Sequence, residues 1–163
     1  MSAFMRFFVA PVFLATLLFS AHTLHAASLN VTRDVVVNET PEEVWRVIGT
    51  YSDMSWHPAV HSTQMSGART PTRMLILGDG SIVREELIDN VDGQSFTYKI
   101  LSGPLPVVNY VSTVSVESVG RNKSRVTWTS TFDPPPNVSK SDSQKAIIGV
   151  YEAGLDNLKK MFR

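Results

Sequence analysis

The stretch from Thr40 to Pro58, TPEEVWRVIGTYSDMSWHP, limits the folds open to this chain more than any other segment. Thr40 suits a helix N-cap and Pro41 the first helical position, so a short helix is predicted to follow. Its apolar residues form one stripe that ends at Gly49. The aromatic-rich run after Gly49 predicts a second, shorter helix. Two apolar turns in succession require a large concave surface to pack against.

Segments rich in β-branched residues supply that surface as a series of strands. Strands are predicted at residues 29–37, 60–66, 73–77, 81–91, 95–101, 107–119 and 125–132. Gly78-Asp79-Gly80 is a hairpin signal between two of them, and the prolines of Ser102 to Pro106 exclude that segment from the sheet. We therefore expect several antiparallel strands.

The last predicted element is a long amphipathic helix from Ser141 to Phe162. Its apolar residues recur at helical spacing, at Ile147, Tyr151, Leu155, Leu158 and Phe162. Ser141 and Gln144 form a capping-box pattern at its start. An antiparallel sheet crossed by one long helix predicts an α+β domain.

Residues 1–26 have the pattern of a secretory signal peptide. Arg6 is their only charged residue, an apolar core runs from Phe7 to Ala21, and cleavage is expected after Ala26 or Ala27. A retained membrane anchor is the alternative, but a spanning helix needs about 20 apolar residues. We therefore expect a secreted or periplasmic protein that has one domain, residues 27–163, and no membrane contact after cleavage.

Charge and composition exclude several classes of function. The chain has 15 basic and 15 acidic residues, and loss of Arg6 with the signal leaves 14 basic residues, which gives no electrostatic footprint for nucleic acid. The absence of cysteine excludes disulfides, thiol chemistry and cysteine metal sites. His57 and His61 are separated by Pro58 and have no third convergent ligand, so we predict no metal and no cofactor.

The order of motifs resembles that of a known superfamily. A strand is followed by the threonine-proline-x-x-valine-tryptophan helix from Thr40, the Trp56-His57-Pro58 turn, further strands and a long last helix. This order resembles the START-like, or helix-grip, superfamily (SRPBCC), with its Bet v 1-like and polyketide cyclase/dehydratase groups. The resemblance implies a curved antiparallel sheet wrapped around the last helix, two short helices after the first strand, and a cavity between sheet and helix.

Some local patterns are similar to a narrower group within that superfamily. They include Trp56-His57-Pro58-Ala59-Val60, Arg84-Glu85-Glu86-Leu87 and Leu105-Pro106-Val107. These resemble a bacterial periplasmic branch that includes the accessory protein of methanol oxidation systems. The resemblance implies a protein that assists a periplasmic dehydrogenase or its cytochrome partner.

Strand alternation predicts which side chains face the cavity. The expected inward faces are Val83, Glu85 and Leu87; Phe96, Tyr98 and Ile100; Val108, Tyr110, Ser112, Val114 and Val116; and Val126, Trp128, Ser130 and Phe132. Glu85 would be a carboxylate in an apolar space, which requires a partner, a water network or a proton. His57 is the candidate partner. The alternatives are an exposed strand carboxylate for Glu85 and a partly exposed turn for His57.

The candidate ligand-binding residues combine these faces with the turn and the helix. They are Trp56, His57, Glu85, Tyr98, Leu105, Tyr110, Trp128, Val150 and Gly154. Small residues such as Gly154 on the last helix permit either close packing against a strand or a hollowed cavity wall. In the plant hormone receptors of the superfamily, a lysine that contacts the ligand's carboxylate stands where His57 stands here. This chain lacks that lysine, which puts the binding of an acid in doubt.

Three functions are consistent with these patterns. The first is binding of an apolar or amphipathic small molecule, which predicts a closed apolar cavity of roughly several hundred Å³. The second is the accessory role, which predicts a filled or minor cavity and an exposed patch edged by residues 104–106 and 134–136. The third is cyclase- or dehydratase-like catalysis, which requires Glu85 and His57 within hydrogen-bond reach of a common substrate position. Binding is favoured over the accessory role, and catalysis has the least support.

Overall fold

The computed structural model describes residues 28–67 and 70–163, so the predicted signal peptide lies outside the described residues. The described residues form seven strands and two helices. In chain order these are β1 (Leu29–Val37), α1 (Pro41–Ile48), β2 (Val60–Ser66), β3 (Thr72–Leu77), β4 (Ile82–Val91), β5 (Ser95–Ser102), β6 (Val108–Gly120), β7 (Lys123–Asp133) and α2 (Lys140–Met161). The bounds agree with the predicted strands and long helix to within two residues.

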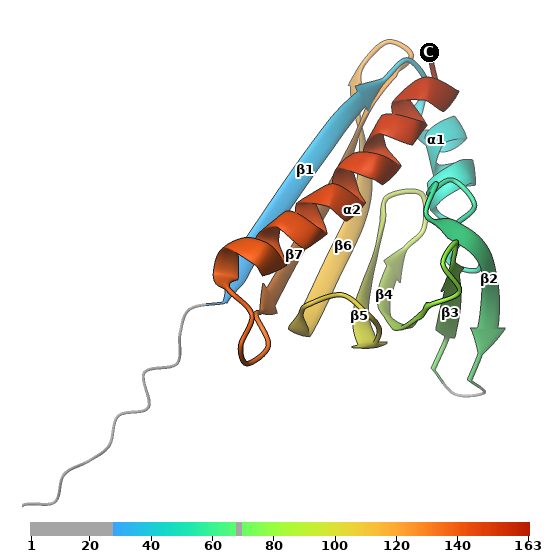
Figure 1. The fold of residues 1–163 in the computed structure, drawn as a ribbon. Coiled ribbons are helices and arrows are strands. Elements are labelled where there is room, and N and C mark those ends of the chain that lie inside the picture. Colours follow the sequence, from blue (N-terminus) through green and yellow to red (C-terminus); the bar gives the residue numbers. More distant parts are fainter. Residues whose placement is uncertain (1–27, 68–69) are drawn as a thin grey trace, which may run out of the picture.

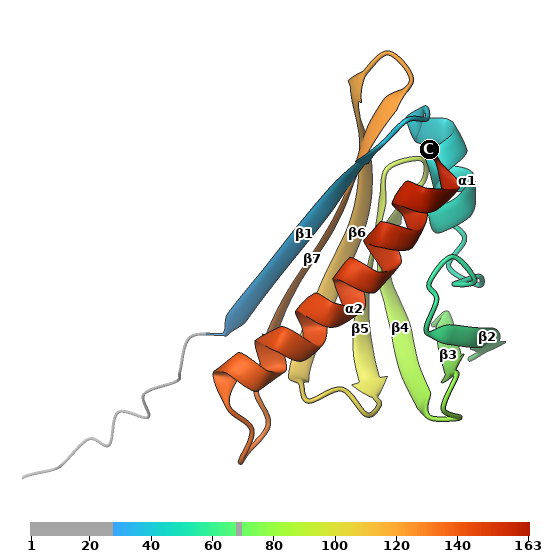
Figure 2. The same ribbon diagram turned by 45° about the horizontal axis from the view of Figure 1, so that its top comes forward.

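The strands form one antiparallel sheet in the order β1-β7-β6-β5-β4-β3-β2. Strands β2 to β6 each pair with the next strand along the chain, and β1 forms one edge of the sheet beside β7, with Leu29 opposite Phe132. The sheet curves, and α2 crosses one face of it (Figure 1). Figure 2 shows α2 running along β1 and β7, while β2 and β3 lie at the opposite edge. The predicted α+β helix-grip fold is confirmed.

Helix α1 begins and ends where its sequence predicts. The Thr40 hydroxyl accepts a hydrogen bond from the Glu43 amide at 3.4 Å, and Pro41 occupies the first helical position. The Gly49 amide donates to the carbonyl oxygen of Trp45 at 2.7 Å and ends the helix. The apolar side of α1 then packs into the core.

The second short helix predicted after Gly49 does not form, because the chain makes a series of turns there. The Asp53 carboxylate accepts a hydrogen bond from the Ser55 amide at 2.8 Å, a side-chain turn that competes with helical bonding. The Met54 amide is bound by the Thr63 hydroxyl at 3.2 Å instead of by a helical carbonyl. The side chains of this segment therefore reach the core from turns.

Helix α2 begins at Lys140, and its N-cap is Ser139, where the sequence predicted Ser141. The Ser139 hydroxyl oxygen accepts a hydrogen bond from the Asp142 amide at 3.0 Å and donates to Asp142 Oδ2 at 2.8 Å. The capping pair is thus Ser139 with Asp142, and the Ser141-Gln144 pattern lies inside the helix. Among residues 28–67 and 70–163, no helix is long and apolar enough to cross a membrane.

The inward faces predicted by alternation are confirmed with one exception. The buried members are Val83, Glu85, Phe96, Tyr98, Tyr110, Ser112, Val114, Val116, Val126, Trp128, Ser130 and Phe132. Val108 was expected to face inward, but 41% of its surface is exposed. The register between β6 and β7 shifts between Val108 and Val111, where Asn109 has a left-handed φ of 54°. This irregularity breaks the alternation ahead of Tyr110, so the prediction was wrong for Val108.

Candidate functional site

A cavity of about 70 Å³ lies between the sheet, the turns before β2 and the middle of α2. Its lining residues are Met54, His57, Ala59, Val60, Leu75, Leu77, Val83, Glu85, Tyr98, Ile100, Leu105, Tyr110, Trp128 and Val150. Seven of the nine predicted ligand-binding residues are therefore brought together, and the other two, Trp56 and Gly154, lie outside the wall. Leu105 is placed by its loop, which the Ser143 hydroxyl ties to α2 through a hydrogen bond to Pro106 O at 2.7 Å.

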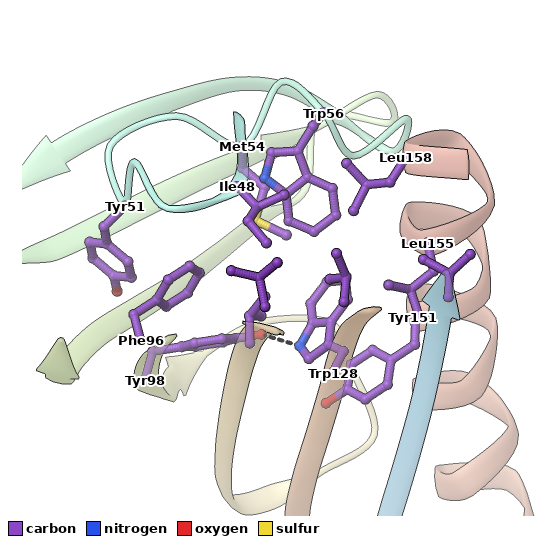
Figure 3. Close-up of a cluster of buried hydrophobic side chains, with 14 of the residues drawn as sticks. Ile48, Tyr51, Met54, Trp56, Phe96, Tyr98, Trp128, Tyr151, Leu155 and Leu158 are labelled. Carbon is purple, nitrogen blue, oxygen red and sulfur yellow. Dashed lines mark hydrogen bonds between the residues drawn. The ribbon is translucent and has the colours of Figure 1, made fainter. Parts of the chain in front are cut away.

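The cavity is much smaller than the ligand-binding alternative predicted, because aromatic rings fill the space between sheet and helix. The Trp128 ring stacks on Tyr151 of α2 with centroids 4.4 Å apart, and Trp56 packs against Trp128 at 5.5 Å. Figure 3 shows these rings in one cluster with Tyr98 and Phe96. The remaining space is confined to the side of the cluster that faces β3 to β5.

Gly154 allows close packing of aromatic rings on α2 and does not hollow the cavity wall, the other role that its small size allowed. A Cβ atom at this position would lie 2.7 Å from His57 Cδ2, 3.0 Å from a Trp56 ring carbon and 3.1 Å from a Trp128 ring carbon. The three rings therefore rest directly on the backbone of α2. Trp56 and Gly154 therefore do not line the cavity but pack against Trp128, which does.

His57 is buried and joins the turn before β2 to α2. Its Nε2 atom lies 2.9 Å from the carbonyl oxygen of Val150, and its Nδ1 atom lies 3.2 Å from the Ala59 amide nitrogen. The amide can only donate, so Nδ1 accepts and Nε2 carries the proton that is donated to Val150. Burial lowers the pKa of His57 below its ordinary 6.5, against a smaller raising effect of the Val150 carbonyl. His57 is therefore neutral, with both ring nitrogens engaged.

Glu85 is buried, as the inward face of β4 predicted, but its partner is Arg73 and not His57. Arg73 Nε lies 2.6 Å from Glu85 Oε2, and both side chains are almost completely inaccessible to solvent. Arg73 Nη1 donates to the carbonyl oxygen of Tyr51 at 3.0 Å, and its guanidinium carbon lies 4.2 Å from the centroid of the Tyr51 ring. Burial raises the pKa of Glu85, and the charge and hydrogen bond of Arg73 oppose that shift.

Arg73 is the site residue that the sequence reasoning missed, although the sequence holds a signal for it. The hairpin turn at residues 78–80 brings Leu77 and Ser81 together, with the Leu77 amide donating to Ser81 O at 2.9 Å. Counting back along both strands from this turn places Arg73 opposite Glu85. Arg73 and Leu75 also share the buried face of β3. Hairpin register combined with alternation would therefore have found the pair.

The tyrosine hydroxyls behind the cavity form a directed hydrogen-bond chain. The Ser112 hydroxyl donates to Thr129 O at 2.8 Å, so its proton is already used. At 3.1 Å the Tyr151 hydroxyl must therefore donate to Ser112, and at 2.6 Å the Tyr110 hydroxyl must donate to Tyr151. The oxygen of Tyr110 keeps its lone pairs for another donor.

Trp128 directs a second branch of this network. Its Nε1–H is shared between Ser112 Oγ at 3.0 Å and the Tyr98 hydroxyl oxygen at 3.1 Å. Figure 3 shows the bond to Tyr98. Burial raises the pKa of Tyr98 and of Tyr110 well above the ordinary value, so both stay protonated at neutral pH. The oxygen of Tyr98 therefore accepts from Trp128, and its hydroxyl keeps a proton that it can donate.

The geometry does not assemble the acid–base pair that the catalytic alternative requires. Glu85 is engaged by Arg73, and His57 directs its proton to a backbone carbonyl. Within the described part of the chain, no three His, Cys, Asp or Glu side chains converge on a possible metal position. What the site offers chemically is an apolar wall with a carboxylate and two tyrosine hydroxyls.

Solved structures share this fold. XoxI of Bacillus cereus is 34% identical to this chain, with a TM-score of 0.76 over 82% of this chain and 94% of its own. A START superfamily protein from Mycobacterium smegmatis has a TM-score of 0.70 at 11% identity, covering 82% of this chain and 96% of its own. The Zhui aromatase/cyclase from Streptomyces sp. R1128 has a TM-score of 0.64 at 13% identity, covering 82% and 93%. The last two similarities concern the fold alone.

A family model gives the assignment that the fold and the motif order predicted. Among functionally curated proteins, none matches this chain. The model described as polyketide cyclase / dehydrase and lipid transport matches residues 28–163. The chain belongs to this polyketide cyclase / dehydrase and lipid transport family.

Proposed function

We propose that this protein is an exported binding protein that holds one small, largely apolar molecule in the cavity between sheet and α2. The observation that carries the proposal is the cavity itself, an apolar wall on which Glu85, Tyr98 and Tyr110 are the polar side chains with hydrogen-bonding capacity left. Small-molecule sites characteristically combine an apolar lining with a few convergent polar groups. Val60, Leu105 and Val150 on the cavity wall are only partly buried, so we expect a ligand to enter between them.

The volume limits the ligand more strictly than the family assignment does. An apolar cavity of about 150 Å³ in another protein accepts a benzene ring. The 70 Å³ available here is about half of that, so the ligand has only a few heavy atoms. A polyketide or lipid chain would require the aromatic cluster around Trp128 to separate from α2.

Native mass spectrometry of the protein purified from its own host tests the proposal, followed by denaturation to release a bound molecule. We expect a stoichiometric small compound that is lost in Val150→Phe, which fills the cavity from α2. Val111→Phe is the matched control, because Val111 is exposed on the opposite face of the sheet. A protein without any bound compound in all three preparations would count against the proposal. The intact mass also tests export, since cleavage should leave a chain that begins at Ala27 or Ser28.

The second candidate is an accessory role beside a periplasmic dehydrogenase or cytochrome, for which a filled or minor cavity is the expectation, in agreement with the 70 Å³ found here. Two further observations favour it. The chain is 34% identical to XoxI, and its local patterns resemble the accessory branch of methanol oxidation systems. Leu101, Val108 and Val111 are exposed large apolar side chains that line an open groove between β5 and β6. The groove adjoins the proline loop where this alternative predicted a patch.

Co-purification from the host periplasm separates the two candidates. An accessory protein should bring down an identified dehydrogenase or cytochrome, and Leu101→Lys should abolish that association. The same substitution leaves the cavity intact, so ligand retention should be unchanged. Recovery of the protein alone, with its ligand, would remove the accessory candidate.

A further inference from the structure

The second carboxylate oxygen of Glu85 is the strongest indication of what the cavity accepts. Glu85 lines the cavity, and its hydrogen bond to Arg73 uses Oε2, which leaves Oε1 without a donor among the described residues. Arg73 Nη2, on the same edge of the guanidinium group as Nε, is also buried without a hydrogen-bond partner in that part of the chain. A carboxylate oxygen beside apolar atoms is costly unless a donor reaches it. The ligand can supply that donor.

The Tyr98 hydroxyl adds a hydrogen-bond donor to the cavity wall that carries the Glu85 acceptor. Glu85 on β4 and Tyr98 on β5 both point into the cavity, and their positions differ by one inward-facing pair of the β4–β5 register. The Tyr98 oxygen accepts from Trp128, so its proton is available to the cavity. A group that both donates and accepts would satisfy the carboxylate and the phenol together. A hydroxyl group has this property.

The charges of Glu85 and Arg73 further limit the class of ligand that the cavity accepts. An anionic ligand would face the Glu85 carboxylate with no lysine on the cavity wall to receive it. A cationic ligand would meet a carboxylate whose charge Arg73 already compensates at 2.6 Å, with Arg73 itself close behind it. In a low-dielectric site both arrangements leave a net charge uncompensated. An uncharged ligand avoids this cost.

We infer that the cavity binds a small uncharged molecule bearing a hydroxyl group, of the size of a short-chain alcohol, which donates to Glu85 and accepts from Tyr98. This inference rests on the binding function proposed above and names its ligand class. The alkyl part of the ligand packs against Leu75, Val83 and Val150, and Arg73 holds the carboxylate in place from behind.

Methyl-detected NMR titration of the purified protein with four probes tests the ligand class. The probes are 1-propanol, propylammonium, propionate and xenon, which share a small size but differ in charge and hydrogen bonding. We expect saturable shifts of the Val83 and Val150 methyl signals with 1-propanol at millimolar concentration. Propylammonium and propionate should bind at least about tenfold more weakly, since each leaves a buried charge unpaired. Xenon reports whether the cavity is accessible at all, because it forms no hydrogen bond.

Two variants test whether the preference for 1-propanol depends on the Arg73–Glu85 ion pair. Glu85→Gln should weaken 1-propanol binding about fivefold to tenfold, because a charged acceptor becomes a neutral one. Because this change also leaves Arg73 unpaired, the double variant Arg73→Met/Glu85→Leu provides an apolar replacement of the whole pair. It should bind xenon as the wild type does and lose its preference for 1-propanol. Glu117→Gln, an exposed carboxylate remote from the cavity, is the control and should change nothing.

The outcomes distinguish failure of this inference from failure of the binding function. If propylammonium, propionate or xenon binds at least as tightly as 1-propanol, the cavity is a binding site but the inferred hydroxyl class of ligand is wrong. The hydroxyl class is also wrong if 1-propanol binding is unaffected in both variants. If none of the four probes shifts the cavity methyl signals, the cavity is closed or holds only water. In that case the proposed binding function fails together with the inference.

Discussion

Arg73 and Glu85 form an ion pair whose two side chains are almost completely buried. The pair sits between the cavity on one side and the Tyr51 ring on the other, so each charge depends on its partner for compensation. The desolvation penalty of such a pair is about as large as the electrostatic attraction between its charges. The pair therefore adds little net stability but fixes the position of the carboxylate. Loss of one partner alone is strongly destabilising.

Breaking this pair should destabilise the protein strongly. Glu85→Ala or Arg73→Met should each lower the free energy of unfolding by about 3–5 kcal/mol, because the remaining charge stays buried alone. Arg73→Met/Glu85→Leu should lose less than either single change. Urea denaturation measures all three, and Glu86→Gln, which breaks the exposed pair with Lys99, should cost no more than about 1 kcal/mol. Equal losses at Glu85 and Glu86 would contradict the assignment of a buried pair.

His57 should make stability depend on pH in the mildly acidic range. Burial depresses its pKa below 6.5, so near that pH the unfolded chain binds a proton that the folded protein does not. The contribution of His57 to the free energy of unfolding is fully present above pH 6.5 and is lost as the pH falls toward its folded-state pKa. The slope is at most about 1.4 kcal/mol per pH unit.

Comparison with His57→Asn isolates this contribution from those of other titrating groups. Unfolding curves of both proteins between pH 7 and pH 5 should diverge, with the wild type losing more stability on acidification. Glu85 acts in the opposite direction, since its raised pKa makes the folded state bind the extra proton, but it is present in both proteins. Parallel curves would show that His57 titrates equally in the folded and unfolded chain.

At the scale of the element, α2 decides how close the sheet and helix come. Gly154 allows three aromatic rings to touch the helix backbone. Gly149 on the same helix is exposed, and a Cβ atom added there would meet no other atom within 4 Å. The two glycines therefore differ only in what surrounds them. A helix usually gains stability when glycine is replaced by alanine.

The same substitution at these two positions should have opposite effects. Gly149→Ala should stabilise the protein by about 0.5–1 kcal/mol, because helical glycine is conformationally costly. Gly154→Ala should destabilise it by about 1–3 kcal/mol, because the new methyl group would overlap the rings of His57 and Trp56. Thermal unfolding of both variants checks the signs. Stabilisation at Gly154 would mean that the aromatic cluster yields easily.

At the scale of the whole molecule, one core connects every layer. Buried side chains of α1, of the sheet and of α2 belong to one continuous cluster, from Val44 through Trp128 to Leu158. The chain has no cysteine, so no disulfide holds this core together. Neither helix has a separate core into which it could fold independently.

A protein beginning at residue 28 should therefore unfold in one cooperative step. The calorimetric and van't Hoff enthalpies should agree, as they do for two-state domains, and a reducing agent should leave the transition unchanged. Differential scanning calorimetry with and without the reductant makes the measurement. Two resolved transitions would show that α2 or the β2–β3 edge unfolds on its own.

The amino-acid sequence by itself determined the strands, the long helix, most of the inward faces and the family. Period-two alternation and helical spacing are local properties, so they survive without knowledge of any distant contact. The exceptions, at Val108, the second short helix and the N-cap of α2, are places where one side-chain hydrogen bond or one register shift overrides the pattern.

The sequence also predicted seven of the residues that line the cavity, but only the tertiary structure decided their hydrogen-bond partners and the cavity volume. The Nε2 proton of His57 is accepted by the carbonyl oxygen of Val150, far along the chain, and the cavity volume is limited by the close stacking of Trp128 on Tyr151. Both depend on the distance between the sheet and α2, which no local pattern encodes. Physically, a free volume is the small remainder after all large side chains have been packed, so it follows from the sum of many long-range contacts.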